Sequence, residues 1–176
     1  MTALIPQRPA TAPAALTWQI LDTPDGPFAV VETAADSVIA AGWTDDADAL
    51  LRRSRLAGSA MEEGRVSAAA AVEAYYSGDL DAPLRVPVHD RAGGFGARVR
   101  AALRDIPPGE VRRYGDVAAA LGNPRASRAV GAACGANTAA LFVPCHRVIG
   151  ASGALTGFAW GVDVKRALLE REGALA

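Results

Sequence analysis

The sequence predicts an α+β protein, with a small α/β unit over residues 16–88 and a mostly helical unit over residues 94–176. Near the N-terminus, apolar and β-branched runs flank an Asp-Gly pair, which is typical of a β-hairpin. From Phe95 onward, apolar residues recur at the three- and four-residue spacing of a helix. The 176 residues, 51% of them hydrophobic, are enough to bury a core in one larger or two smaller domains.

Short-range patterns predict each element of the first unit. Strands at 18–22 and 28–33 flank the turn TPDGP. The segment 84–88 is predicted to be an edge strand, because Pro87 has no N–H to donate inside a sheet. Between these segments we expect, in chain order, a third strand at 37–43 and helices at 46–56 and 65–76. A loop at His89–Gly94 then leads into the second unit.

The second unit contains a pair of short helices. They are predicted at Tyr114–Leu121 and 126–136, and the turn Gly122-Asn123-Pro124 separates them. A helix-turn-helix has this shape, and it places its second helix in a groove of DNA. The other elements of this unit are, in chain order, a helix from Phe95 that ends before Pro107, an apolar strand at Leu141–Val143 that leads toward Cys145, and a last helix at Val164–Glu172.

Composition argues against several classes of protein. Residues 1–15 carry three prolines and no basic start before an apolar run, so we expect a flexible lead-in rather than a signal peptide. No apolar stretch is long enough to span a membrane. Two cysteines are too few for a disulfide framework, which indicates free thiols in a reducing compartment and hence a cytoplasmic protein. No cluster of residues suggests a metal site.

The charges are distributed unevenly along the chain. Residues 1–90 carry 6 Arg and 13 Asp or Glu, a net charge of −7, whereas residues 91–176 carry 12 Lys or Arg and 6 Asp or Glu, a net charge of +6. A basic half beside an acidic half indicates that the basic half contacts a polyanion. A solvated basic face is the alternative interpretation of the same pattern.

Cys145 has an unusual setting for a cysteine. Pro144 precedes it, and His146 and Arg147 follow it. Nearby positive charge lowers the pKa of a thiol and raises the fraction of thiolate, the form that attacks carbon. In an extended segment His146 points away from the sulfur, so it would act through a bend or a bridging water. We expect Arg147 to form a buried ion pair that fixes the loop, and Cys134 to be a small packing residue.

The segment Pro144-Cys145-His146-Arg147-Val148 resembles the active-site signature of the O6-alkylguanine-DNA alkyltransferases. The likeness is strongest from Phe95 to Gly173 and looser from Trp18 to His89. It includes the stretches IPPGEVRRYGDVA, SRAVGAACGAN, VPCHRVIGASGALTGFAWG and KRALLEREG. The resemblance implies a ribonuclease H-like N-terminal domain and a winged-helix-like C-terminal domain that carries the helix-turn-helix.

The resemblance also implies a reaction. A monomeric protein of this family binds double-stranded DNA through the minor groove and moves the alkyl group of O6-alkylguanine, or of O4-alkylthymine, to the residue that matches Cys145. The base must flip out, because its O6 substituent cannot reach a thiol inside the duplex. The thioether formed is a poor leaving group, so each molecule reacts once, and no cofactor is required.

Residue by residue, the resemblance implies further roles. Glu172 completes a Cys–water–His–Glu chain, in which it orients His146 and favours its charged form. Asn137 matches the hinge between recognition helix and active-site turn, Tyr114 the group that protonates the leaving guanine, and Arg128 the finger that replaces the flipped nucleotide. Small residues that let the helix approach the DNA backbone closely are Ala126, Ser127, Ala129, Gly131, Ala132 and Gly135.

The implied substrate pocket departs from the family pattern. Its wall consists of Val148 and the loop Gly157-Phe158-Ala159-Trp160, and the backbone carbonyls of Cys145 and Val148 would accept from the guanine amino group. Phe158 stands in place of the commoner tyrosine, and Ala159 in place of a serine. Trp160 stands where some members have glycine, and we expect it to be a bulky lid that narrows the pocket.

Two other functions remain open at this stage. A non-enzymatic lesion sensor would share the DNA-binding unit, but such relatives lack the cysteine, which is present here as Cys145. A Cys–His hydrolase usually brings its histidine from a distant segment. The only histidine besides His146 is His89, in the predicted loop between the two units.

Overall fold

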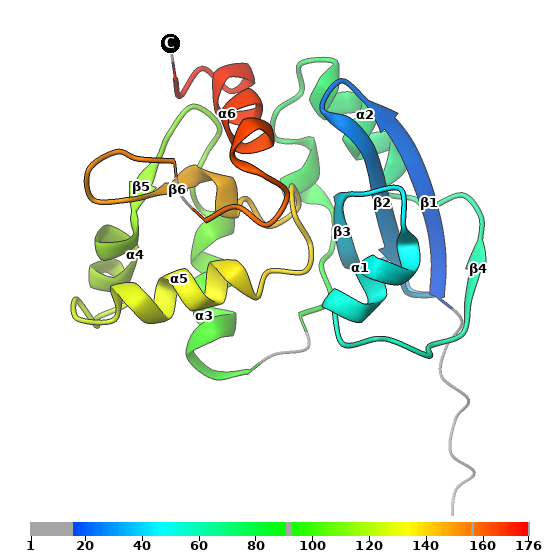
Figure 1. Cartoon of the computed structure of the whole chain (residues 1–176), viewed down its shortest axis with the longest axis horizontal. Helices are drawn as coiled ribbons and strands as arrows, with labels where there is room; N and C mark the ends of the chain where they lie inside the picture. Colours follow the sequence, from blue (N-terminus) through cyan, green and yellow to red (C-terminus); the bar gives the residue numbers. More distant parts are fainter. Residues whose placement is uncertain (1–15, 91–92, 156, 176) are drawn as a thin grey trace, which may run out of the picture.

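The computed structural model describes residues 16–90, 93–155 and 157–175. Its main sheet has the strand order β3-β2-β1-β4, formed by Leu16–Thr23 (β1), Gly26–Glu32 (β2), Val38–Trp43 (β3) and Met61–Glu63 (β4). The first three strands form an antiparallel meander, and β4 lies parallel to β1 (Figure 1). The predicted hairpin is confirmed, and its turn places Gly26 at a φ of +112°, a conformation that favours glycine.

Two helices cover the two faces of this sheet. Phe28 and Val30 of β2 pack in the cluster that contains α2 (Ala69–Tyr76), whereas Ala29 and Val31 pack in the one that contains α1 (Ala47–Arg53). Side chains alternate in this way because successive residues of a strand point to opposite faces. Asp46 begins α1 by accepting a hydrogen bond from the Ala49 N–H (2.8 Å), the usual role of an N-cap aspartate.

The first unit differs from the prediction in two places. The prediction of an edge strand at 84–88 is wrong, because Ala82–Arg85 forms a 3₁₀ turn (η1). Pro83 lies in the first turn of η1, where a helix tolerates a residue without an N–H. Only Val88 joins the sheet, through an isolated bridge to Val38. Strand β4 was not predicted, and its three residues are too few to show a clear alternating pattern.

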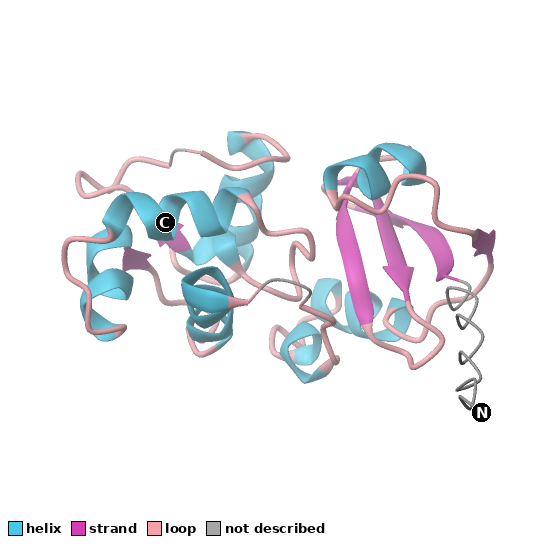
Figure 2. Cartoon of the chain, turned by 90° about the horizontal axis from the view of Figure 1, so that it is seen from below, coloured by secondary structure: helices cyan, strands magenta, loops and turns pink. Residues whose placement is uncertain are grey.

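Helices dominate the second unit. They are α3 (Gly94–Arg104), α4 (Tyr114–Ala120), α5 (Ser127–Gly135) and α6 (Val162–Arg171), with a two-stranded parallel pair of Arg112–Arg113 (β5) and Val148–Ile149 (β6). The predicted helix pair is therefore present as α4 and α5, and both α3 and α4 pack against α5. Figure 2 shows the main sheet on one side of the molecule and these helices on the other.

The segment that leads to Cys145 is not the predicted strand. Leu141–Val143 forms a turn in which the buried Leu141 has a φ of +72°, and Cys145–Arg147 continues as a 3₁₀ turn (η2). The backbone hydrogen bonds here are local, from the Val143 N–H to the Ala139 carbonyl (2.9 Å) and from the Cys145 N–H to the Val143 carbonyl (2.8 Å). Because these local bonds replace a strand ladder, the apolar run folds back on itself.

One hydrophobic cluster runs through both units. Phe28 of β2 and Phe142, just before the cysteine turn, lie 6.4 Å apart between ring centroids. Backbone hydrogen bonds join the same regions, from the Ala41 N–H to the Thr138 carbonyl (2.8 Å) and from the Ala140 N–H to the Ala41 carbonyl (3.0 Å). Strand β3 therefore supports the chain directly before Cys145.

Candidate active site around Cys145

Asn137 connects the end of α5 to the turn that carries Cys145. Its Nδ2 donates to the Cys145 sulfur (3.1 Å) and to the Val143 carbonyl (2.8 Å), and its Oδ1 accepts from the Ala139 N–H (3.1 Å). Both Asn137 and Cys145 are buried. The side-chain amide therefore fixes the sulfur relative to α5.

The protonation state of Cys145 differs from the expectation. Burial raises the pKa of the thiol, while the hydrogen bond from Asn137 and the positive charge of Lys165 act in the opposite direction. Arg147 does not contact the sulfur, because its guanidinium is directed at Glu172. The resting protein therefore favours the thiol, and attack on carbon requires a base.

His146 lies beside Cys145 in sequence but bonds to another partner. Its Nε2 lies 2.9 Å from Glu172 Oε1, and its buried Nδ1 has no hydrogen-bond partner among the described residues. Burial lowers the pKa of His146, and the hydrogen bond to Glu172 opposes this shift only in part. Glu172 thus acts in the expected direction, because it favours the charged form of His146, but the burial of the ring outweighs this effect in the resting protein. A neutral ring that donates from Nε2 presents Nδ1 as a proton acceptor.

Glu172 is the centre of a buried hydrogen-bond network. Besides His146, it accepts from Arg147 Nε (2.8 Å) and Nη2 (2.9 Å) and from Tyr75 Oη (3.0 Å). Burial alone would raise its pKa, but the hydrogen bonds from His146 and Arg147 lower the pKa of Glu172 to about 2. Arg147 also donates to the Ile106 carbonyl (2.6 Å), so the predicted buried ion pair is present.

Sequence reasoning missed two members of this centre. Tyr75 reaches Glu172 from α2, 97 residues away, and no local pattern marks that contact. Lys165 of α6 is buried and donates to the Val148 carbonyl (2.6 Å). A signal for Lys165 did exist, because it is the only lysine among the 18 basic residues. The hydrogen bond from Lys165 occupies one lone pair of the Val148 carbonyl, which was expected to accept a hydrogen bond from the guanine amino group.

Small residues form most of the exposed face of α5. Arg128, Ala129, Ala132 and Gly135 are exposed, and Ser127 and Gly131 are partly exposed. Ala126 differs from them, because it is buried in the core and its side chain does not reach this face. An open hollow beside the helix is lined by Tyr114, Gly115, Ser127, Arg128, Gly131 and Ala151.

Tyr114 lies between α5 and the predicted pocket wall. A methyl group on Gly131 would contact its ring at 3.9 Å, and one on Gly157 would lie 3.9 Å from its Oη. Burial raises the pKa of Tyr114, with Cys134 and Cys145 contributing in the same direction. The phenol thus keeps its proton and is positioned beside the loop in which the pocket wall was predicted.

The wall loop rests on strand β3. Phe158 packs against Trp43, with 6.0 Å between ring centroids, and the Trp160 indole lies against Gly42. The structure thus places Trp160 beside the N-terminal sheet, and its role as a lid stays a prediction. Gly157 and Ala159 are exposed, whereas Val148 and Pro144 are buried.

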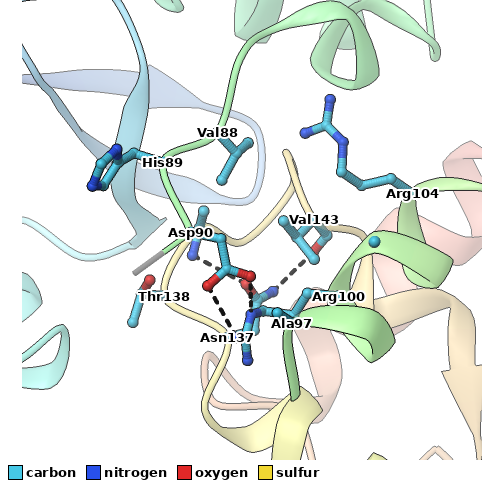
Figure 3. A pocket seen from close by; sticks show the side chains of 11 residues that line it. Val88, His89, Asp90, Ala97, Arg100, Arg104, Asn137, Thr138 and Val143 are labelled. Atoms are coloured by element: carbon cyan, nitrogen blue, oxygen red, sulfur yellow. Dashed lines mark hydrogen bonds and ion pairs between the residues drawn. The ribbon is translucent and has the colours of Figure 1, made fainter. Parts of the chain in front are cut away.

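A cavity of about 400 Å³ lies between the linker at 88–90 and α3 (Figure 3). The ion pair of Asp90 with Arg100 crosses it (Nε–Oδ2 2.9 Å), and Asn137 forms part of its lining. His89 lines this cavity but Cys145 does not, so His89 is not placed to assist the thiol. This arrangement argues against a Cys–His hydrolase that uses His89.

The described residues carry neither a membrane-length apolar helix nor a group of three His, Cys, Asp or Glu side chains suited to a metal ion. What the geometry around Cys145 offers is a buried thiol, a neutral histidine with an unpartnered ring nitrogen, and a phenol beside the wall loop. These groups are suited to nucleophilic attack followed by proton transfer.

Residues 94–174 match the family model described as the DNA-binding domain of 6-O-methylguanine DNA methyltransferase. The chain is 50% identical over 102 residues to a methylated-DNA–protein-cysteine methyltransferase of Methanosarcina acetivorans, covering 58% of this chain and 65% of that protein. It is 52% identical over 101 residues to the protein of that name from Mycobacterium tuberculosis H37Rv, covering 57% of this chain and 61% of the relative. The matches thus span less than two thirds of these relatives.

Solved structures match over a longer part of the chain. A Mycobacterium tuberculosis OGT in complex with DNA has a TM-score of 0.76 and 38% identity, covering 90% of this chain and 93% of that chain. The O6-methylguanine-DNA methyltransferase of Pyrococcus kodakaraensis has a TM-score of 0.72 and 25% identity, covering 90% of this chain and 99% of that chain.

Proposed function

Because this chain belongs to the 6-O-methylguanine DNA methyltransferase family, we propose that it repairs DNA by moving the alkyl group of O6-alkylguanine to its own Cys145. The observation that carries the proposal is the setting of the thiol, which is held by Asn137 and followed directly by a neutral, Glu172-bound histidine. Such an arrangement would hold the sulfur of Cys145 in place for a single transfer of the alkyl group.

Binding would begin on the exposed face of α5. Its small side chains allow the helix to approach the sugar-phosphate backbone in the minor groove, and Arg128 at its start would fill the space of the flipped nucleotide. Unstacking a base costs a few kcal/mol, which a group inserted into the gap partly offsets. Ser127 and Gly131 border the hollow next to Tyr114, which supports an entry path for the base on this side.

In the chemical step, His146 Nδ1 takes the thiol proton through a bridging water, since the side chains of Cys145 and His146 have no direct bond in the described chain. The thiolate attacks the alkyl carbon, a C–S bond forms, and the C–O6 bond breaks with its electron pair on guanine. Tyr114 supplies a proton to the leaving base and recovers one from His146. The thioether product ends the reaction after one event per molecule.

Lys165 would have a supporting role in this scheme. Its bond to the Val148 carbonyl orients that carbonyl, whose second lone pair remains for the guanine amino group. The Cys145 carbonyl similarly accepts from the Val148 N–H within η2 and keeps one lone pair. The pocket wall would consist of Val148 with Gly157, Phe158, Ala159 and Trp160.

The finer architecture belongs to the same proposal. The strand order β3-β2-β1-β4, with β4 parallel to β1, supports a ribonuclease H-like domain over residues 16–88. The pair β5–β6 beside α4 and α5 supports a winged-helix-like domain over residues 94–176. We further propose a cytoplasmic monomer that acts on double-stranded DNA, accepts O4-alkylthymine as a second substrate, and needs no cofactor.

The test is a single-turnover labelling experiment. Duplex DNA with a labelled O6-methylguanine should leave at most one label per protein, on the peptide that contains Cys145. Cys145→Ser should abolish labelling and still bind the same DNA, because serine is nearly isosteric and the α5 face is untouched. Repeated turnover, or label on another residue, would contradict the scheme.

A further inference from the structure

The end of strand β3 contacts two segments of the second unit, the segment 138–140 that precedes Cys145 and the wall loop 157–161. Ala41 pairs with the segment 138–140 through two backbone hydrogen bonds, as described above. Trp43 packs against Phe158, and Gly42 lies beneath Trp160. The loop 157–161 is thus seated on the N-terminal sheet by two neighbouring strand residues.

Gly42 has no side chain because Trp160 occupies that space. A methyl group on Gly42 would overlap the six-membered ring of the Trp160 indole. The backbone of Gly42 is not in the left-handed region, so its conformation would permit alanine. Trp160 also packs against both hydrophobic clusters, on either side of the sheet. The requirement for glycine at this position therefore comes from the indole.

Arg53 covers the same indole and extends the contact to α5. Its guanidinium lies 5.5 Å from the centroid of the Trp160 ring, within the range of a cation–π interaction. Its Nη2 also donates to the Gly135 carbonyl (2.9 Å) at the C-terminal end of α5, where a cation is favourable. One side chain from α1 thus joins the wall loop to the helix that would contact DNA.

From this geometry we propose that Trp160 is a positioning residue, held between Gly42 and Arg53, that fixes the pocket wall 157–161 relative to Cys145 and α5. The proposal rests on the alkyl transfer proposed above and assigns a role in that reaction to the N-terminal unit. A shift of about 1 Å in a substrate-holding wall can cost up to 100-fold in rate. The contact would act on the rate of transfer and leave the α5 face unchanged.

The experiment measures single-turnover transfer from duplex O6-methylguanine DNA for wild type, Gly42→Ala, Trp160→Ala and the double variant. The final amount of label per protein gives the folded, active fraction, and the rate at saturating DNA reports the position of the wall. We expect Gly42→Ala and Trp160→Ala each to lower the saturated rate by roughly ten-fold. The half-saturating DNA concentration should stay unchanged. In the Trp160→Ala background, Gly42→Ala should have no further effect.

Matched variants separate this role from general stability. Arg53→Ala should slow transfer, whereas Arg52→Ala, which removes an exposed partner of Asp46 on the same helix, should not. Trp160→Phe keeps an aromatic face over Gly42 and should give an intermediate rate, which keeps the test valid if Trp160→Ala folds poorly.

Three outcomes would overturn the inference. In the first, both single variants are fully labelled and transfer the methyl group at the wild-type rate. In the second, Gly42→Ala lowers the rate by the same factor whether residue 160 is tryptophan or alanine. The third is faster transfer by Trp160→Ala, above all from O6-benzylguanine, which would make Trp160 a lid. Absence of label on wild type itself would instead refute the proposed function.

Discussion

The network around Glu172 and the exposed face of α5 are built in opposite ways. Around Glu172, ionised and polar groups are buried, and three side chains donate to one carboxylate. On α5, small side chains and one exposed arginine face outward. The difference indicates that the first region is stabilised by fixed partners, whereas the second is kept free for a partner. Changes in the first should cost stability, and changes in the second should cost function alone.

The largest effect should come from Glu172→Gln. This change leaves the buried Arg147 without its counter-charge, and breaking one side of a buried ion pair typically costs about 3–5 kcal/mol. Urea unfolding should show this loss in the free energy of unfolding. Glu170→Gln is the control, because it makes the same chemical change at an exposed position of α6. If Glu172→Gln lowers the free energy of unfolding by less than about 1 kcal/mol, the network contributes no more to stability than an exposed ion pair.

A smaller effect should appear in the pH dependence of stability. The pKa of His146 lies below its unfolded value of 6.5 in the folded protein, so the unfolded chain binds more protons as the pH falls below that value. Its contribution to stability is complete above pH 6.5 and is lost on acidification, by at most about 1.4 kcal/mol per pH unit.

Unfolding measured between pH 7.5 and 5 (roughly the range over which histidine titrates) checks this expectation. His146→Gln should flatten the slope, since glutamine does not titrate. The Glu172 carboxylate, with a pKa of about 2 against 4.5 for the unfolded chain, adds a separate loss only below pH 4.5. A wild-type slope equal to that of His146→Gln would mean that the folded protein does not hold this histidine neutral.

The smallest change in stability should accompany Arg128→Ala. Surface substitutions of this kind usually alter the free energy of unfolding by less than about 0.5 kcal/mol. Transfer from duplex DNA should nevertheless slow, because flipping loses the group that fills the gap, while transfer from single-stranded DNA should change little. Arg125→Ala, in the exposed turn before α5, is the matched control. Equal rates on duplex DNA for wild type and Arg128→Ala would remove the finger role.

The sequence was informative where structure depends on neighbours in the chain. The hairpin at Gly26 and the helices α4 and α5 were predicted because turn residues and helical spacing act over a few positions. The resemblance brought together Cys145, Asn137 and Glu172, which no periodicity links. The strand at Leu141–Val143 was wrong because an apolar run does not reveal which partner it has, and here its bonds are local.

What could not be predicted depends on burial and on distant contacts. Nearby charges were expected to lower the pKa of Cys145 and to favour the charged form of His146. The cost of burying a charge outweighs these effects, so burial raises the pKa of Cys145 and lowers that of His146. Tyr75 and Arg53 act across 97 and 82 residues of chain. Such contacts have no signature in a single sequence, because they arise only when the two units pack together.

The interlocking of Gly42 with Trp160 also limits how this protein can evolve. A side chain at position 42 would overlap the Trp160 indole. Tryptophan at position 160 therefore has to be replaced before glycine at position 42, because the opposite order passes through a protein in which the two side chains clash. Positions 42 and 160, 118 residues apart in numbering, should therefore covary among descendants, with bulk at one matched by its absence at the other.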